Sequence, residues 1–595
     1  MLTTLTAPAF AGTWYIEDGD ITISAGESGN NVTQNENTTK NDPDTIITNR
    51  EDGASSHTVT IDAKDKDDKV EVTLKDVNID ASSRSEAAVS VTGKGDTTIE
   101  LDGDNELKSG AGHAGLEHNK TDTSGELTIQ DKDNNGSLEA AGGFKGAGIG
   151  SAGSHDAQVK ITGGNITATS DDWGAGIGSG SYGTGTVEIT GGEINATGGY
   201  LGAGIGGGCN GSGNVTISGG TITAAGSDGA AGIGGGYYNG ATVTITGDAV
   251  IKNASSTKYG AGIGGGNGSD GNVTISGNAK IENATGGYGA AGIGGGAFSS
   301  PDKIGNGNVV IKDNAKIDNV QGGAYGAGIG GGIYGLSNVT IEGNTKVNAT
   351  GGAGGAAIGG GAGAENNSDN NGNQITIKSN ENGSPTINAV GGGTDEGEEI
   401  VIGGAGIGAG CESDADADIT LEGKVTITAT AGKDNVAIGA NGIEQEFSGL
   451  AEGSSITRYD PEGNDTSLPG DKVPVTPVVP DDTSSGGSAD ASVQESVFPG
   501  LVVTDKDGQR ISYTSIRGNN VLSLRVGRFT ASLHASLATL RQLRAEGIDT
   551  ITFQTILCST TLSVDELLAM GGEDTEVVLT HHIRSSTLTV GGKAV

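Results

Sequence analysis

The feature that most constrains this chain is a glycine-rich motif that recurs about every 28 residues. The motif Gly-Ala-Gly-Ile-Gly occupies Gly146–Gly150, Gly174–Gly178 and Gly202–Gly206, and it returns with small variations as far as Ile438. The central isoleucines are spaced 28, 28, 28, 30, 30, 36, 29, 49 and 31 residues apart. Such a period is the signature of a repeat architecture, so the fold is expected to consist of stacked units.

A second motif with the same period lies between successive copies of the first. It reads Val-x-Ile-Thr-Gly-Gly-x-Ile in Val159–Ile166 and Val187–Ile194, and Val-Thr-Ile-Ser-Gly-Gly-Thr-Ile in Val215–Ile222. The alternation of apolar and polar residues predicts two short strands around a Gly-Gly turn, and the isoleucine motif supplies a third. Three strands in one repeat cannot bury a core alone, whereas stacked repeats can.

The sequence therefore predicts a mainly β protein in which residues 12–447 form a parallel β-helix, taken as right-handed. Valine and isoleucine should point inward and stack from coil to coil, while threonine, lysine, glutamate and asparagine point outward. Residues 12–140 fit the same pattern with more charged and more variable coils. We expect about 15 coils, at roughly 4.8 Å per coil.

Composition narrows the class of protein. Glycine contributes 112 of 595 residues, but there is no Gly-X-Y period and only 10 prolines, which excludes collagen. Three cysteines are too few for a disulfide scaffold, and no apolar run approaches the ~18 residues of a transmembrane helix. The net charge of −40 argues against nucleic acid and anionic membranes as partners. It suits an extracellular surface, or one that collects divalent cations.

Three further segments flank or follow the predicted β-helix. Residues 1–11 contain Ala9-Phe10-Ala11, an A-x-A cleavage site after apolar residues, and are interpreted as the remnant of a signal peptide. Residues 448–497 are rich in proline, serine and aspartate and are predicted to be a linker. Residues 498–595 are predicted to be a small α+β domain whose role the sequence does not reveal.

Within the α+β domain, alternation and turn residues predict strands over 501–504, 511–514, 521–526, 551–556, 576–580 and 587–590. Leu533, Leu537, Leu540 and Leu543 are spaced as on one face of a helix, so Ala531–Glu546 is predicted to be helical. Ser563 and Glu566 form a capping-box pattern that predicts the start of a second, short helix.

The repeats resemble a known family. Strands such as Val215–Ala224 (Val-Thr-Ile-Ser-Gly-Gly-Thr-Ile-Thr-Ala), repeated with Gly-Ala-Gly-Ile-Gly-Gly-Gly, are similar to those of extracellular β-helix proteins of clostridial and gut Firmicutes. These are grouped as carbohydrate-binding-domain-containing surface proteins. The resemblance covers roughly residues 12–445. It implies a non-catalytic bacterial protein, secreted or associated with the cell wall, that binds polysaccharide for adhesion or substrate capture, with calcium as a candidate cofactor.

Aromatic residues supply a more specific hypothesis about the site. Between residues 16 and 446 there are eleven aromatics, and all of them lie four or five residues before or after the isoleucine of the glycine-rich strand. Stacked coils would align them in two columns along one edge, where aromatic faces could bind sugar rings. The alternative is an aromatic ladder that only packs against itself. The candidate glycan-binding residues are Trp173, Tyr182, Tyr200, Tyr237, Tyr238, Tyr259, Tyr288, Tyr325 and Tyr334, with Phe144 and Phe298 in the same positions.

Acidic residues near these aromatics are candidates for calcium binding. Asp171, Asp172 and Asp270 could hold the ion or hydrogen-bond a sugar, because calcium prefers carboxylate and carbonyl oxygens. The alternative is that these carboxylates are solvated surface groups, and no loop matches an EF-hand.

Catalysis is a further function class that such a fold can serve. Parallel β-helices include polysaccharide lyases and hydrolases, and a lyase acting on polyuronates needs a cation to neutralise the carboxylate and a base to remove a proton. The chain has no arginine between Arg84 and Arg458 and no Gly-His-Gly segment, so we expect no enzyme activity. A passive stalk that displays the C-terminal domain is the main alternative to glycan binding.

Overall fold

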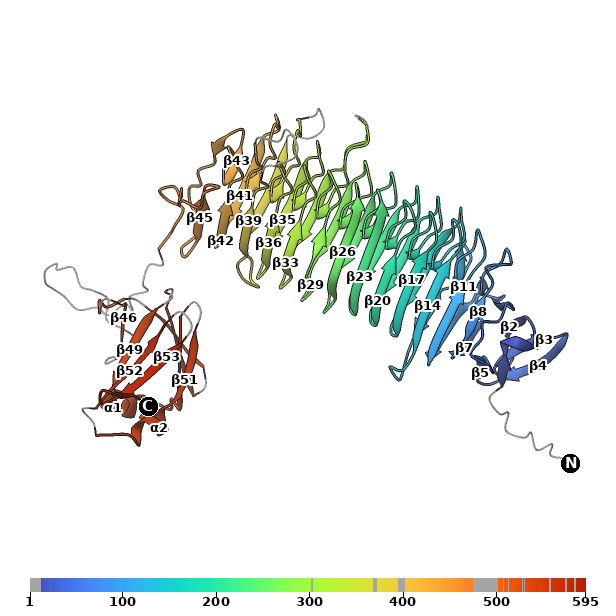
Figure 1. Cartoon of the computed structure of the whole chain (residues 1–595), viewed down its shortest axis with the longest axis horizontal. Helices are drawn as coiled ribbons and strands as arrows, with labels where there is room; N and C mark the ends of the chain where they lie inside the picture. The colour runs from blue at the N-terminus through green and yellow to red at the C-terminus, as the bar shows by residue number, and fades with distance from the viewer. Residues whose placement is uncertain are drawn as a thin grey trace. The chain divides into compact units, whose positions relative to one another are not determined.

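A computed structural model of the chain shows a long parallel β-solenoid and a smaller C-terminal unit (Figure 1), which divide near residue 478. The structure describes residues 12–300, 303–366, 372–393, 402–474 and 501–594, except 507, 512, 519, 527, 529, 556–557, 573–574 and 583–584. The predicted signal-peptide remnant, residues 1–11, therefore lies outside the described residues. The prediction of a mainly β, parallel solenoid is confirmed, with about 16 turns.

Each turn of the solenoid contributes to three parallel sheets, which we name A, B and C. Sheet A carries the Val-x-Ile strands of the second motif, which alternate between buried and outward residues. Its strands are β1 (Thr13–Tyr15), β5 (Thr45–Thr48), β7 (Lys69–Lys75), β10 (Asp96–Asp102), β13 (Leu127–Gln130), β16 (Asp156–Ile161), β19 (Gly185–Ile189), β22 (Gly213–Ile217), β25 (Ala241–Ile245), β28 (Gly271–Ile275), β32 (Gly307–Ile311), β35 (Ser337–Glu342), β38 (Asn373–Lys378) and β41 (Ala417–Glu422).

Sheet C follows sheet A after the Gly-Gly turn and has the same alternation. In this turn Gly192 has φ of 92°, and a Cβ there would lie 2.7 Å from the carbonyl oxygen of Gly164, so a side chain does not fit. The strands are β8 (Asn78–Asp80), β11 (Asp104–Lys108), β14 (Ser137–Gly142), β17 (Asn165–Ser170), β20 (Glu193–Thr197), β23 (Thr221–Asp228), β26 (Val250–Lys258), β29 (Lys280–Ile281), β30 (Ala284–Thr285), β33 (Lys316–Gln321), β36 (Lys346–Thr350), β39 (Thr386–Val390), β42 (Thr426–Thr430) and β45 (Ser455–Tyr459).

Sheet B consists of the isoleucine-glycine strands, which are very short in most coils. Gly206 illustrates why glycine follows the isoleucine: its φ is 131°, and a Cβ would lie 2.1 Å from the carbonyl oxygen of Gly234 in the next coil. The strands are β2 (Ile21–Ala25), β6 (Val59–Ala63), β9 (Val89–Gly93), β12 (Leu116–Lys120), β15 (Ile149–Gly150), β18 (Ile177–Gly178), β21 (Ile205–Gly206), β24 (Ile233–Gly234), β27 (Ile263–Gly264), β31 (Ile293–Gly294), β34 (Ile329–Gly330), β37 (Ile358–Gly359), β40 (Ile407–Gly408) and β43 (Ile438–Ala440).

The solenoid core is made of aligned aliphatic columns. Ile177 pairs in register with Ile205 in sheet B, and Val187 pairs with Val215 in sheet A. Both columns are essentially inaccessible to solvent and belong to one continuous core cluster that runs from Ile16 to Ile456. Identical residues thus stack coil on coil, which fixes the register because a slip of one residue would turn the aliphatic side chains outward.

Both ends of the solenoid are closed by non-repeating structure. At the N-terminal end, a 3-10 turn (Ile16–Asp18) follows β1, and β3 (Asn30–Gln34) and β4 (Asn37–Asp42) form an antiparallel meander on β2. At the other end, β44 (Ile443–Glu444) pairs with β43, and β45 pairs with β42. Strand β45 lies inside the predicted linker 448–497, so the first part of that segment belongs to sheet C. The rest of the predicted linker, from residue 475, is outside the described residues.

The C-terminal unit has its own core between two small sheets and two helices. One sheet contains β46 (Leu501–Thr504), β49 (Ala531–Ser536), β52 (Glu576–His581), β53 (Ser586–Val590) and β54 (Lys593–Ala594). The other contains β47 (Thr514–Gly518), β48 (Val521–Arg525), β50 (Thr550–Gln554) and β51 (Ser559–Ser563). The helices are α1 (Leu537–Ala545) and α2 (Val564–Leu568), and Ser563 caps α2 by accepting the Glu566 N–H.

Two predicted elements of this unit are wrong in part. Among the described residues of the strand predicted over 511–514, only Thr514 lies in a strand, as the first residue of β47, and an antiparallel bridge joins Thr504 and Arg510 instead. The helix predicted over Ala531–Glu546 begins only at Leu537, and Ala531–Ser536 is strand β49. Ala531, Leu533 and Ala535 are buried on one side of β49, which pairs with β46 and β52. Leu533 fits both a helical and an alternating pattern, and the cross-strand pairing decides in favour of the strand.

Candidate functional site

Two turns flank each sheet B strand, and they lie next to each other along the solenoid. We call the residues before the sheet B isoleucine the leading turn and those after it the trailing turn. The Cys209 N–H of one trailing turn donates to the Trp173 carbonyl oxygen of the preceding leading turn at 2.7 Å, and Ala297 donates to Tyr259 at 2.8 Å in the same way. Leading and trailing turns therefore form one continuous surface.

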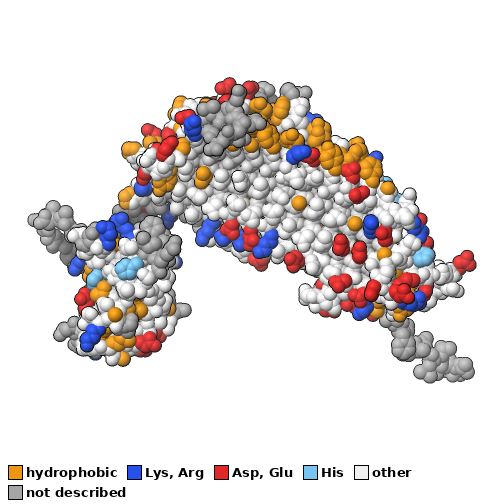
Figure 2. Space-filling view, viewed as in Figure 1, with side chains coloured by type: hydrophobic (Ala, Val, Ile, Leu, Met, Phe, Trp, Pro, Cys, Tyr) orange, Lys and Arg blue, Asp and Glu red, His pale blue; other side chains and the backbone are white. Residues whose placement is uncertain are grey.

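All eleven aromatic residues described above lie on these two turns, and we call this surface the aromatic ridge. Figure 2 shows hydrophobic side chains gathered along one edge of the solenoid. The ridge residues with the greatest exposure are Tyr182 (59%), Tyr200 (51%) and Tyr288 (47%). The full set is Phe144, Trp173, Tyr182, Tyr200, Tyr237, Tyr238, Tyr259, Tyr288, Phe298, Tyr325 and Tyr334.

Six of the ridge aromatics have a left-handed backbone conformation. They occupy the position four residues before the sheet B isoleucine or five residues after it. Other coils have glycine at these positions, for example Gly229 (φ 86°) in a leading turn and Gly363 (φ 68°) in a trailing turn. A bulky residue with positive φ is an outlier. The six, with φ between 40° and 71°, are Trp173, Tyr182, Tyr238, Tyr259, Tyr325 and Tyr334.

Some of the ridge rings pack against one another, and others stand apart. Tyr288 contacts Tyr259 and Tyr325 edge to face, with centroids 6.2 Å and 5.5 Å apart. Phe298 and Tyr334 form a similar pair at 4.9 Å. The ridge thus contains a self-packing ladder in its central coils, as one of the two hypotheses predicts, together with well-exposed rings such as Tyr182.

Electrostatics differ along the ridge. Lys145 Nζ lies 5.2 Å and 5.1 Å from the ring centres of Phe144 and Trp173, within cation–π range. The rings of Tyr237 and Tyr238 are tilted by 36° with their centres 3.7 Å apart. Burial, followed by the hydrogen bond to Tyr238, raises the pKa of Tyr237 to about 12. The Tyr237 hydroxyl therefore stays protonated at physiological pH.

The three aspartates predicted to hold calcium do not form one cluster. Asp171 and Asp172 are adjacent in a leading turn, where burial and then the Asp171 charge raise the pKa of Asp172. Asp270 lies on another coil, before strand β28, and its Oδ1 accepts the Asn306 N–H at 2.8 Å. In the described part of the chain, a different set of three carboxylates lies close together.

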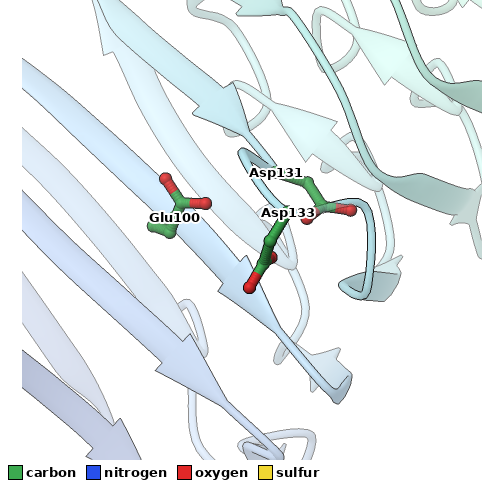
Figure 3. A group of neighbouring side chains, drawn as sticks. All are labelled: Glu100, Asp131 and Asp133. Carbon is green, nitrogen blue, oxygen red and sulfur yellow. The ribbon is translucent and has the colours of Figure 1, made fainter.

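That group is Glu100, Asp131 and Asp133, whose oxygens lie within 4.8 Å of one another (Figure 3). Glu100 comes from β10, whereas Asp131 and Asp133 lie between β13 and β14, at the corner between sheets A and C. This corner is separate from the aromatic ridge. Lys132 Nζ lies 3.4 Å from Glu100 and 2.6 Å from Glu71, so a lysine already compensates part of the charge.

Sequence reasoning missed this group, although a local signal was present. Asp131, Asp133, Asn135 and Gly136 have the D-x-D-x-N-G spacing of the first half of a calcium loop. The glutamate that would complete such a loop is absent, because residue 142 is glycine. Glu100 approaches from the preceding coil instead, and only the stacking of coils reveals that neighbour.

Comparisons with known proteins agree with the architecture. Four stretches of the solenoid, residues 159–181, 187–209, 215–237 and 273–297, match the family model described as Beta helix repeat. The chain is a parallel β-helix protein. No curated protein and no solved structure gives a significant match to it. β-Helix repeats occur in enzymes and in non-enzymes. The match therefore supports the fold of this β-helix and does not identify its function.

Proposed function

We propose that this β-helix protein is a non-catalytic extracellular protein, secreted or held at a bacterial surface, that binds polysaccharide along its aromatic ridge. The observation that carries the proposal is the left-handed conformation of six ridge aromatics. For L-residues that conformation costs roughly 1–2 kcal/mol each, and several other coils have glycine at the same position, without this cost. A bulky side chain at such a position therefore suggests a role beyond closing the turn.

Exposure separates sugar binding from packing as that role. Tyr288 makes two edge-to-face ring contacts, so packing accounts for part of its placement. Tyr182 is 59% exposed, and burial of the ring therefore accounts for little of its placement. An exposed ring can pack against the C–H face of a sugar while hydroxyls and amides bind the polar rim.

The charges of the solenoid favour a neutral polysaccharide as ligand and a non-catalytic role. Its arginines are Arg50, Arg84 and Arg458, and each is engaged in an ion pair. A negatively charged chain repels polyuronates and other polyanions, and these arginines already form ion pairs with carboxylates.

In the described part of the chain, no helix has the length and apolar character needed to cross a bilayer.

Retention of the purified full chain on insoluble polysaccharides tests the proposal. We expect the wild type to be retained on at least one neutral polymer among cellulose, xylan, mannan and chitin, in the presence of either calcium or EDTA. The triple variant Tyr200→Ala, Tyr259→Ala, Tyr288→Ala should lose at least about 10-fold in affinity, because exposed aromatics dominate such surfaces. Retention that depends on calcium would assign a role to the acidic residues.

The control is Ser154→Gly, which changes a non-aromatic residue at the left-handed position of a trailing turn (φ 68°). It should bind as the wild type does. Absence of binding to every polymer would overturn the proposal and favour the alternative of a passive stalk that carries the C-terminal unit. New reducing or unsaturated ends in the incubated polymers would show that the protein is an enzyme.

A further inference from the structure

A polar groove of about 610 Å³ lies on the outward face of sheet A, next to the trailing turns. It spans the coils that contain β32, β35, β38 and β41. Its lining includes Asn306, Asn308, Leu336, Asn338, Gln374 and Asp418. The residues that form it come from the part of the solenoid where the repeat is interrupted by the 36-residue and 49-residue spacings.

The floor of the groove is a column of amide and carboxyl side chains at one register position. Asn308 pairs with Asn338, Asn338 with Gln374, and Gln374 with Asp418 in neighbouring strands, so these side chains repeat about every 4.8 Å. Asn308 Nδ2 donates to Asn272 Oδ1 at 3.0 Å. Asn338 and Asp418 are exposed, and neither side chain has a hydrogen-bond partner among the described residues.

The wall beside the trailing turns is held in place by hydrogen bonds and packing. Asn306 Oδ1 accepts the Leu336 N–H at 3.0 Å, and the Asn306 N–H donates to Asp270 Oδ1. The Leu336 side chain is buried with Ala364 and Ala415, which belong to the trailing loops of the next two coils. The fold therefore holds this wall in a fixed position. The Asn338 amide and the Asp418 carboxylate of the floor are exposed beside it.

The groove adjoins the aromatic ridge through the chain itself. Tyr334 precedes Leu336 by two residues and Asn338 by four, so its Cα lies within about 15 Å of the groove floor. The Tyr334 ring is 43% exposed, and its backbone is left-handed. A saccharide bound on Tyr334 could therefore extend over the amide column of sheet A.

We propose that this groove is a saccharide subsite that selects neutral sugars over acidic ones. The inference rests on the proposed glycan binding along the ridge and adds a second, polar contact region to it. Sugar hydroxyls both donate and accept hydrogen bonds, which matches the free amide of Asn338 and the free carboxylate of Asp418. Neither lysine nor arginine lines the groove in the described part of the chain, so a uronate or sulfate group would meet Asp416 and Asp418 without a compensating cation.

Calorimetric titration of the full chain with hexasaccharides tests this subsite. The neutral probes are cellohexaose, xylohexaose, mannohexaose and hexa-N-acetylchitohexaose, and the acidic probe is hexagalacturonate. We expect at least one neutral probe to bind at least about 10-fold more tightly than hexagalacturonate. Asn338→Ala should weaken that neutral probe about 5-fold, as expected for loss of a hydrogen bond. Asp418→Lys should reduce the discrimination by raising the affinity for hexagalacturonate.

The matched control is Asn214→Ala, since Asn214 is an exposed residue at the same register position in β22, outside the groove. It should leave both affinities unchanged. Absence of binding by all neutral probes, or equal binding by Asn338→Ala and the wild type, would overturn the subsite. If polymers are still retained through the ridge tyrosines in that case, the proposed function stands without the subsite. If polymers are not retained, the ridge proposal fails, and the subsite that rests on it fails with it.

Discussion

Tyr182 places a large side chain where the two adjacent coils have Ser154 and Asn210 and more distant coils have glycine. Its φ is 65°, and more than half of the side chain is exposed. The corresponding residues three and six coils further along the solenoid are Gly268 and Gly363, both with φ of 68°. At this residue, backbone conformation and side-chain exposure both suggest that the ring is not retained for stability.

Replacement of Tyr182 by glycine should therefore leave stability unchanged or raise it. Relief of the left-handed conformation outweighs the greater entropy of glycine in the unfolded chain, and the net gain is expected to reach at most about 1 kcal/mol. Chemical denaturation of the full-length variant measures this. A loss of more than about 1 kcal/mol would show that the ring is structural, as a self-packing ladder requires.

A buried histidine gives a prediction about pH. His118 is 2% exposed, and its Nδ1 lies 3.0 Å from the Gln158 carbonyl oxygen. Burial lowers the pKa of His118, so the folded chain resists protonation more than the unfolded chain does. Its contribution to stability is complete above the unfolded pKa of about 6.5 and is lost as pH falls below that value, by at most ~1.4 kcal/mol per pH unit.

The measurement is the free energy of unfolding of the wild type and of His118→Asn between pH 7.5 and pH 5. The variant should lose less stability than the wild type over this range, because asparagine can still donate to Gln158 and does not titrate. Parallel pH profiles for the two proteins would contradict the assignment.

At the scale of elements, the end of the solenoid depends on one buried cation. Arg458, on β45, is fully buried and donates from Nε and Nη2 to the two oxygens of Asp471 at 2.8 Å and 3.1 Å. It also forms an ion pair with Glu444 and lies over the Phe447 ring, 5.6 Å from its centre. Through Asp471, these contacts hold the segment after β45 against the last coil.

Arg458→Ala should destabilise the solenoid by about 3–5 kcal/mol, because it leaves the buried carboxylate of Asp471 without its cation. Arg50→Ala is the matched control: Arg50 pairs with Asp18 at the surface, and removal of an exposed pair changes stability by about 1 kcal/mol or less. Thermal unfolding of both variants tests the difference. Equal effects would show that the buried network does not stabilise the terminal coil.

Most strands of the solenoid could be predicted from the sequence, because the repeat spacing and the alternation of apolar and polar residues are visible along the chain. The stacking of Ile177 on Ile205 and of Val187 on Val215 follows directly from the repeat spacing. Strand β45 could not be recognised in the same way, because it lacks the glycine motif and lies among prolines. The aromatic positions were visible in sequence, whereas their left-handed backbone, the Glu100 group and the groove depend on contacts between coils.

At the scale of the whole molecule, the two units have separate hydrophobic cores. Ile205 belongs to the core of the solenoid and Phe553 to that of the C-terminal unit, and both side chains are completely buried. We expect two thermal transitions in the full chain. Ile205→Ala should shift only one of them and Phe553→Ala only the other, each by a destabilisation of about 2–5 kcal/mol. Calorimetry in which both variants shift a single common transition would contradict independent units.

Glycan binding by the ridge is best tested by the affinity of a glycine-substituted ridge for the polysaccharide that the wild type binds. The variant carries glycine at the left-handed positions Trp173, Tyr182, Tyr259 and Tyr334. We expect a folded, parallel β-helix with the circular dichroism spectrum of the wild type and an affinity at least about 10-fold lower. A folded variant with wild-type affinity would contradict the claim that the ridge binds glycans.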